Sequence, residues 1–414
     1  MTEIRKYLEE HREEMISLLA ELTAISSVQG KAEEGCPFGT EPARALELML
    51  RSCGEYGFKV ENIDNYAGSA DLGDDPQLGI LTHLDVVPGW GEDCFTLKRS
   101  GGRLIARGAI DDKGPAAASV FALRAVKELG IPLKKGVRLI FGTNEENGSA
   151  DIAYYRKHRS LPPMVFTPDG EYPLINGEKG MLRVWFSTTL DANVEISAGE
   201  VINAVPGSCT VTECGKIRIY RGKSAHASTP EKGENSITKF LEDYSGESKI
   251  IKSIQHLFPH HDVGGKAIFG DISGNLTCVI SMLKTVENRL SGAVDIRFPM
   301  DRTKQEIFGM LEEKFSAAGL KIDDWEGVEP HYTEENSAFV QALLRVYERM
   351  TGEKGECLTI GGGTYVHEIP GGVAFGAEFP GEDGNMHSPG EFITEENLLK
   401  NAEIMAEAII ELCS

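Results

Sequence analysis

Two adjacent carboxylates, Glu145 and Glu146, follow directly after the apolar run at residues 137–141, which is typical of a buried strand. Like charges side by side at the end of a strand repel each other. Burying them costs free energy unless a cation neutralises them. A source of positive charge is therefore expected close to this pair.

Two further segments place acids or an imidazole at the polar end of an apolar stretch. His83 and Asp85 stand two residues apart at the end of a predicted strand, so their side chains face the same side. Taken alone, a His-x-Asp string is common and predicts little. Asp111 and Asp112 lie between a glycine turn and the start of a helix, where one of them alone would suffice as an N-cap.

Two more candidates complete the set. Asp169 ends another apolar strand, and His387 lies in a loop rich in glycine and proline. Two divalent ions that share one carboxylate would neutralise so many clustered acids. A mixture of imidazoles and carboxylates suits Zn²⁺ or Mn²⁺ better than Ca²⁺, and the lack of thiolates argues against a structural zinc finger.

The elements that must position these residues alternate between strand and helix. Strands are expected at 78–87, 137–143 and 163–169, and helices at 112–130 and 150–159. This alternation predicts an α/β domain with a mostly parallel central sheet. In such sheets, ligands bind at the carboxyl ends of the strands, which is where the candidate residues stand.

After residue 180 the pattern changes to half-exposed strands and two helices. Strands are expected at 181–190, 215–225, 275–283, 290–300 and 320–325, with helices at 234–246 and 303–319. This order predicts a smaller two-layer α+β domain inserted at 183–330. The catalytic domain would then comprise 1–182 and 331–414, resuming with a helix near residue 337.

Bulk properties exclude several classes of function. The net charge of −22, with no Lys/Arg run longer than two, argues against nucleic acid and anionic membranes as partners. Residues 1–25 form an acidic amphipathic pattern, which predicts one helix and no signal peptide. No segment approaches eighteen uninterrupted apolar residues. The eight cysteines are scattered without a C-x-x-C pair, so a reducing, cytoplasmic setting is expected.

Seven strings carry a resemblance to a known family. They are "THLDVVPGW", "ARGAIDDKGP", "GTNEENG", "TPDGEYPLINGEKG", "GKSAHASTPEKGEN", "GGGTYV" and "NMHSPGE". In order and coverage they resemble the di-metal amidohydrolases that include aminoacylase, carnosinase, succinyl-diaminopimelate desuccinylase and the bacterial dipeptidase V. The dipeptidase and carnosinase branch is the most similar. The resemblance implies a zinc-exopeptidase-like catalytic domain and an inserted lid domain.

Carried over by position, the resemblance assigns the metal ligands. Asp111 would bridge two divalent ions, most simply Zn²⁺, with Mn²⁺ or Co²⁺ as alternatives. His83 and Asp169 would complete one site, and Glu146 and His387 the other. The family also implies a cis peptide bond after the bridging aspartate.

The resemblance also assigns the chemistry. Glu145 would be the general base that takes a proton from a water shared by the two ions and passes it to the leaving amine. Glu146 cannot do this as well, because its lone pairs are committed to metal. Asp85 would orient the imidazole of His83.

Further residues would bind the substrate. His226 resembles the lid histidine that stabilises the oxyanion, and Arg297 resembles the arginine that holds the substrate carboxylate. The backbone of Gly361, Gly362, Gly363 and Thr364 would approach the same carboxylate. Asn203 resembles a substrate-binding asparagine, although a plain turn residue explains it almost as well. His367 stands near the position where the family usually has arginine, which leaves the side-chain preference open.

The sequence thus predicts a metal-dependent dipeptidase that acts on small peptides with free amino and carboxyl ends. An N-acyl-amino-acid deacylase is the main alternative, and a non-catalytic metal-binding protein is a third. A monomer and a homodimer both fit. The short separation of Asn203 from His226 leaves open whether His226 acts in its own subunit or across a dimer.

Overall fold

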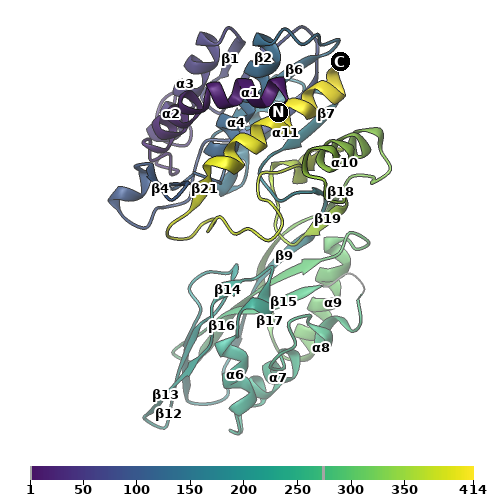
Figure 1. The fold of residues 1–414 in the computed structure, drawn as a ribbon. Helices are drawn as coiled ribbons and strands as arrows, with labels where there is room; N and C mark the ends of the chain where they lie inside the picture. Colours follow the sequence, from purple (N-terminus) through teal and green to yellow (C-terminus); the bar gives the residue numbers. More distant parts are fainter. Residues whose placement is uncertain (1, 273–275) are drawn as a thin grey trace. The chain divides into compact units, whose positions relative to one another are not determined.

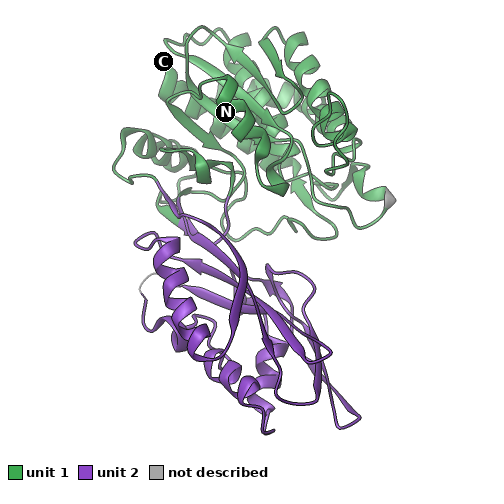
Figure 2. Ribbon diagram, turned by 180° about the vertical axis from the view of Figure 1, so that it is seen from behind, with its two compact units in different colours: residues 1–176, 333–358, 364–414 green, residues 177–332, 359–363 purple. Residues whose placement is uncertain are grey.

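The computed structural model describes residues 2–272 and 276–414, which divide into two compact units (Figure 2). The first unit runs to Asn176 and takes up again at Thr333–Leu358 and Thr364–Ser414. The second unit is Gly177–Tyr332 together with Thr359–Gly363. The second unit therefore starts earlier than the insertion expected from residue 183. The sequence also did not indicate that 359–363 belongs with it.

The first unit is built on a mixed sheet in the order β1-β2-β6-β3-β7-β20-β8 (Figure 1). Its strands are β1 (Lys59–Ile63), β2 (Ala67–Leu72), β3 (Pro76–His83), β6 (Gly136–Gly142), β7 (Met164–Thr167), β8 (Leu174–Glu178) and β20 (Val373–Ala374). The central strands β6, β3, β7 and β20 are parallel, as predicted, and the outer ladders are antiparallel.

Both faces of this sheet are covered. On β3, Ile80 and Leu81 point to opposite faces and both are fully buried, in two separate hydrophobic cores. The helices are α1 (Glu3–Glu10), α2 (Arg12–Thr23), α3 (Thr40–Glu55), α4 (Lys113–Glu128), α5 (Ala150–His158), α10 (Ala338–Thr351) and α11 (Glu395–Cys413). α4 and α11 pack on each other and on β3. α5 packs against β2, and its residues Ile152 and Tyr155 belong to the same core as Leu81.

The acidic N-terminal pattern forms two helices where one was expected. The break falls at His11, whose backbone (φ −106°, ψ 13°) is not helical. Its ring stacks on Tyr7 at 4.0 Å between centroids, and its Nδ1 lies 2.9 Å from the Tyr7 carbonyl oxygen. The chain turns at this point while both helices keep their apolar faces in the core.

The second unit is an antiparallel sheet in the order β13-β12-β10-β15-β16-β9-β17. Its strands are β9 (Gly180–Thr189), β10 (Val194–Ala198), β12 (Ser208–Glu213), β13 (Lys216–Arg221), β15 (Thr277–Val286), β16 (Arg289–Phe298) and β17 (Lys321–Val328). The sequence missed β10 and β12, and the first residue expected for the strand at 275–283 lies outside the described residues. Alternate residues of β9, namely Leu182, Val184 and Phe186, enter one core.

Helices cover that core to give the two-layer α+β arrangement (Figure 1). They are α6 (Ser236–Asp243), α7 (Lys249–Leu257), α8 (Lys266–Phe269) and α9 (Lys304–Ala317). A short two-stranded ladder joins β11 (Ala204–Val205) to β14 (Ala225–His226), and η3 (Pro230–Lys232) follows it.

The remaining elements are short. They are β4 (Lys98–Ser100), β5 (Arg103–Ile105) and β21 (Phe392–Thr394) in a three-stranded sheet, β18 (His331–Tyr332) and β19 (Cys357–Ile360) at the unit boundaries, and η1 (Glu92–Phe95), η2 (Glu145–Asn147) and η4 (Tyr365–Glu368). All eight cysteines are free. None of the helices in the described residues combines the length and apolar character needed to cross a membrane.

Candidate active site

The first unit brings the predicted ligands together at the carboxyl ends of its strands. Six side chains form two groups, and within each group the possible ligand atoms lie within 4.8 Å of one another. The groups are His83, Glu145 and Asp169, and Asp111, Glu146 and His387. They come from segments up to about 300 residues apart in the chain, since His83 is the last residue of β3 and His387 lies in the loop before β21.

Asp111 lies between the two imidazoles. Its Oδ1 is 2.9 Å from Nε2 of His83, and its Oδ2 is 2.8 Å from Nε2 of His387. His83 Nε2 is also 3.6 Å from Asp169, and His387 Nε2 is 3.0 Å from Glu146. One carboxylate therefore faces both groups, with one oxygen directed to each.

The donor atoms fit a divalent cation. Nδ1 of His83 lies 3.0 Å from the carbonyl oxygen of Asp85. A carbonyl only accepts, so Nδ1 carries the proton and Nε2 of the neutral ring presents a lone pair to the carboxylates. Among the described residues, this buried Nε2 has no hydrogen-bond partner. A lone pair that faces carboxylate oxygens is unfavourable unless a positive charge lies between them.

The charges of the site lead to the same conclusion. Burial raises the pKa of Glu145 well above its usual value; His83 opposes this shift, while Asp169 and Glu146 add to it. Burial would lower the pKa of His83, but contacts with Asp111, Asp169 and Asp85 raise it well above 6.5. Even two protonated imidazoles would balance four carboxylates only in part, and bound cations would supply the missing charge and leave the His83 ring neutral.

Asp85 also holds the turn that carries the two glutamates. Its Oδ1 accepts from the backbone N–H of Glu145 at 3.0 Å, and its Oδ2 accepts from that of Glu146 at 3.1 Å. The carboxylate lies 3.6 Å from the His83 ring, while its carbonyl makes the shorter contact. Asp85 therefore contacts His83 through its backbone and fixes the neighbouring turn through its side chain.

The loop of the bridging aspartate is held by a residue that sequence reasoning passed over. Glu391 accepts from the backbone N–H groups of Ile110 at 3.1 Å and of Asp111 at 3.3 Å. Its other oxygen pairs with Arg107, and both side chains are buried. Glu391 ends the "NMHSPGE" string, so its place in a recognised motif was the available signal. It links the Asp111 loop to the segment that carries His387.

The Asp111–Asp112 peptide bond is cis, as the resemblance implied. Asp112 occupies the N-cap position of α4, but its side chain makes no capping bond; its Oδ2 accepts from the backbone N–H of His83 at 3.1 Å. The next residue, Lys113, is fully buried and donates to the carbonyl oxygens of Leu22 at 2.9 Å and Ile25 at 2.8 Å. It thereby satisfies carbonyl groups at the C-terminal end of α2.

The second unit brings two predicted substrate residues together. In the β11–β14 ladder, His226 stands opposite Ala204, and the N–H of Ala227 donates to the carbonyl oxygen of Asn203 at 2.9 Å. The His226 side chain is exposed. Asn203 and His226 therefore share one edge of this unit.

Arg297 lies in the same unit and is 6% exposed. Its Nε and Nη2 donate to Asp295 at 2.7 and 3.2 Å, and its Nη1 donates to the carbonyl oxygen of Gly361 at 3.0 Å. A guanidinium has five N–H groups, so two remain after these three bonds. A Cβ on Gly361 would lie 2.9 Å from Cβ of Ser228, which places the glycine loop beside the His226 segment.

Thr364 and His367, which follow the glycine loop, belong to the first unit. Thr364 lies in the first unit and caps η4, where its side chain accepts from the N–H of Val366 at 3.4 Å. His367 lies within η4, and its N–H donates to the carbonyl oxygen of Thr364. The glycines and Thr364 are therefore divided between the two units.

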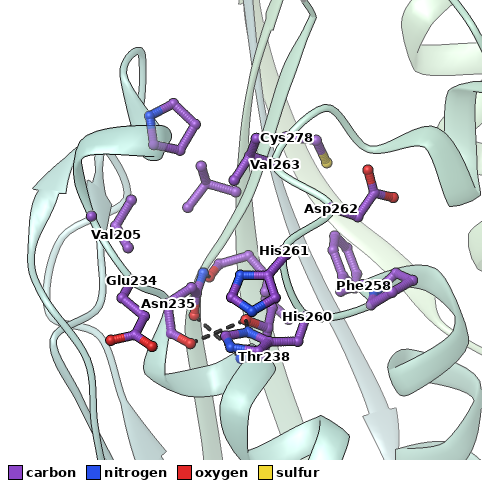
Figure 3. A pocket seen from close by; sticks show the side chains of 15 residues that line it. Val205, Glu234, Asn235, Thr238, Phe258, His260, His261, Asp262, Val263 and Cys278 are labelled. Atoms are coloured by element: carbon purple, nitrogen blue, oxygen red, sulfur yellow. Dashed lines mark hydrogen bonds between the residues drawn. The ribbon is translucent and has the colours of Figure 1, made fainter.

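The second unit also contains a hollow that the sequence did not indicate (Figure 3). Val205 of β11 lines it together with Thr238, whose Oγ1 is 2.8 Å from Nδ1 of His260. None of the predicted substrate residues lines it. The hollow is therefore lined by residues other than those predicted to bind the substrate.

The family follows from comparison with known sequences. The model of peptidase family M20/M25/M40 matches residues 79–411, which is most of the chain. The protein belongs to this peptidase family. The identification made from the motifs is thereby confirmed, and the chain is a peptide-bond hydrolase.

Several similar proteins of the M20/M25/M40 family are named as dipeptidases. It is 32% identical to the putative dipeptidase YtjP of Bacillus subtilis, over 97% of each chain. It is 33% identical to the Beta-Ala-Xaa dipeptidase of Lactobacillus delbrueckii subsp. lactis, over 99% of this chain and 98% of the relative. Human carnosine dipeptidase 1 has a similar structure, with a TM-score of 0.64 at 17% identity and 99% of both chains covered. The fold class expected from the sequence is confirmed.

Proposed function

We propose that the protein is a metal-dependent dipeptidase that hydrolyses dipeptides with free amino and carboxyl ends. The observation that carries the proposal is the position of Asp111, with one carboxylate oxygen directed to His83 and the other to His387. Relatives that carry dipeptidase names match nearly the whole chain, which supports the same activity.

Two divalent cations would be held by the two groups, with Asp111 shared between them. His83 and Asp169 would bind one ion, and Glu146 and His387 the other. Zn²⁺ is the first choice, and Mn²⁺ or Co²⁺ fit the same donor set. When bound, such ions polarise a carbonyl group and lower the pKa of water.

Glu145 is proposed as the general base. It takes a proton from the attacking water and delivers it to the leaving amine, so its carboxylate has to stay free of metal. Asp85 supports this role, because it holds the backbone of Glu145 and Glu146 at 3.0 and 3.1 Å. The two adjacent acids thus divide proton transfer and metal binding between them.

The second unit would supply substrate contacts. His226 is proposed to donate to the oxyanion, and the two remaining N–H groups of Arg297 to bind the substrate carboxylate with the backbone of Gly361, Gly362 and Gly363. Asn203 lies beside His226 and is proposed to contact the substrate as well. Thr364, in the first unit, is proposed to add a contact at the end of the same loop. The inserted domain would act as the lid, in a monomeric or homodimeric cytoplasmic enzyme.

A substrate comparison tests the proposal. Purified protein loaded in turn with Zn²⁺, Mn²⁺ and Co²⁺ would be assayed on β-Ala-Xaa and α-dipeptides, and on the same dipeptides with an acetylated amine. We expect hydrolysis of the free dipeptides only. Faster hydrolysis of the N-acetylated compounds would instead identify a deacylase, and no hydrolysis of either set with any metal would contradict the proposal.

A further inference from the structure

The turn that carries Glu145 and Glu146 has a second support besides Asp85. This support is Asp151, the second residue of α5, whose side chain is fully buried. Its Oδ2 accepts from the backbone N–H of Thr143 at 2.6 Å and of Asn144 at 2.8 Å. Two buried carboxylates therefore hold four consecutive amides: Asp151 binds the first two and Asp85 the next two.

Asp151 is itself held by Tyr365. The phenol donates to Oδ2, the same oxygen that accepts the two turn amides, while Oδ1 accepts from the N–H of Ile152 at 2.7 Å. Among the described residues the carboxylate forms no ion pair, so hydrogen bonds alone stabilise its charge. Burial raises the pKa of Asp151 to about 6, which leaves it ionised and accepting at neutral pH.

The surroundings are built to fit this contact. Tyr365 is 2% exposed, and its ring meets the His83 ring edge to face at 6.0 Å between centroids. A Cβ on Gly142 would collide with both the Tyr365 hydroxyl and the Asp151 carboxylate. Residue 142 therefore has to be glycine for the phenol to reach the carboxylate across the end of β6.

A simpler account is that Asp151 only stabilises the start of α5. A capping side chain would bind amides of the helix itself. Asp151 accepts one helix amide, from Ile152, whereas its other two backbone donors, Thr143 and Asn144, belong to the preceding turn. The phenol adds a donor from a segment more than 200 residues away in the chain. Two of its three bonds to backbone amides therefore restrain the turn.

We propose that Asp151, fixed by the phenol of Tyr365, is a positioning residue that sets the Glu145–Glu146 turn for catalysis and metal binding. The inference rests on the proposed roles of those two glutamates. Residues that orient ligands in this way commonly change metal affinity or activity about 10–100-fold when they are replaced. Small displacements of a catalytic group have effects of similar size.

The test compares two buried tyrosines. Tyr365→Phe removes the donor to Asp151 and leaves the ring in place. Tyr172→Phe is the matched control, because Tyr172 is 1% exposed and its hydroxyl has no hydrogen-bond partner in the described part of the chain. Each variant, loaded with Co²⁺, would be measured for its visible absorption spectrum, its metal affinity in competition with a chelator, kcat, KM and Tm.

For Tyr365→Phe we expect kcat about 10-fold lower with KM nearly unchanged, an altered cobalt spectrum and weaker metal binding. Asp151→Asn should extend each change towards about 100-fold, and Tyr172→Phe should match the wild type in every site readout. A Tyr365→Phe variant that loses only Tm, with spectrum, affinity and kcat like the control, would overturn the inference. If dipeptides prove not to be substrates, the cobalt spectra and the chelator competition still show whether Asp151 and Tyr365 position the metal ligands.

Discussion

The backbone N–H of Ser228 donates to Nδ1 of His226 at 3.2 Å, and the Ser228 hydroxyl lies 2.6 Å from the same nitrogen. An amide N–H can only donate, so Nδ1 has to accept. The neutral imidazole therefore carries its proton on Nε2. This is the tautomer that a neutral donor to an oxyanion needs when it acts through Nε2.

The tautomer can be observed directly. In the ¹⁵N spectrum of labelled protein, we expect His226 to show a protonated Nε2 and an unprotonated Nδ1. Ser228→Ala keeps the amide but removes the hydroxyl, and loss of a bond worth about 1 kcal/mol should lower kcat about fivefold with little change in KM. Ser224→Ala, in the same segment, is the control. A proton found on Nδ1 would refute the assignment.

The division of labour between Glu145 and Glu146 predicts opposite phenotypes. Glu145→Gln should retain nearly two metal ions per chain and lose almost all turnover, because only the base is removed. Glu146→Gln should lose bound metal. Elemental analysis of the purified variants decides between them. The result is not trivial, since Glu145 lies within ligand distance of His83 and Asp169; metal lost from Glu145→Gln would make it a ligand.

The carboxylate clamp makes a prediction about substrates. Amidation of the C-terminus of a dipeptide should lower kcat/KM about 10–100-fold, the effect of losing one hydrogen bond to a charged group. Arg297→Lys should erase the difference between free and amidated dipeptides, because lysine lacks the planar fork. Arg183→Lys is the matched control, since Arg183 also donates to Asp295, at 3.2 Å. Equal rates for wild type on both substrates would exclude the clamp.

Apolar runs in the sequence predicted the central strands of the first unit and the residues at their ends. β3, β6 and β7 are apolar runs that end in polar residues, so both the strands and the positions of His83, Glu145 and Asp169 were predictable. β13 was predicted within 215–225 although five of its six residues are exposed, whereas β10, of five residues, and β12, of six, were missed. The family strings, and not periodicity, identified His387.

The supports of the site could not be predicted in this way. Asp151 and Glu391 act through bonds from their carboxylates to backbone amides, and any backbone can donate such a bond. The partners of Glu391, at Ile110 and Asp111, lie 281 and 280 residues away in the chain. Residue type and spacing do not predict such a contact, so only the folded chain shows which carboxylate accepts from the amides of which turn.

Glu391 provides the last prediction, because it joins a buried ion pair to the loop of the bridging aspartate. Glu391→Gln leaves the guanidinium of Arg107 buried without a counter-charge, which should cost about 3–5 kcal/mol of unfolding free energy. It should also weaken metal binding about 10–100-fold, since the amide of Asp111 loses a charged acceptor. Urea unfolding and chelator competition of the metal-loaded enzyme measure the two effects.

The control for Glu391→Gln is Glu396→Gln. Glu396 pairs with Arg5 at 2.8 Å, but its side chain is 64% exposed, so the same change there should alter neither stability nor metal affinity measurably. If Glu391→Gln lowered stability alone, the pair would serve folding and the Asp111 loop would be set by other contacts. If it matched the control in both measurements, the pair would have no part in the site. Coupled losses in the two measurements are what the bonds from Ile110 and Asp111 to a single carboxylate require.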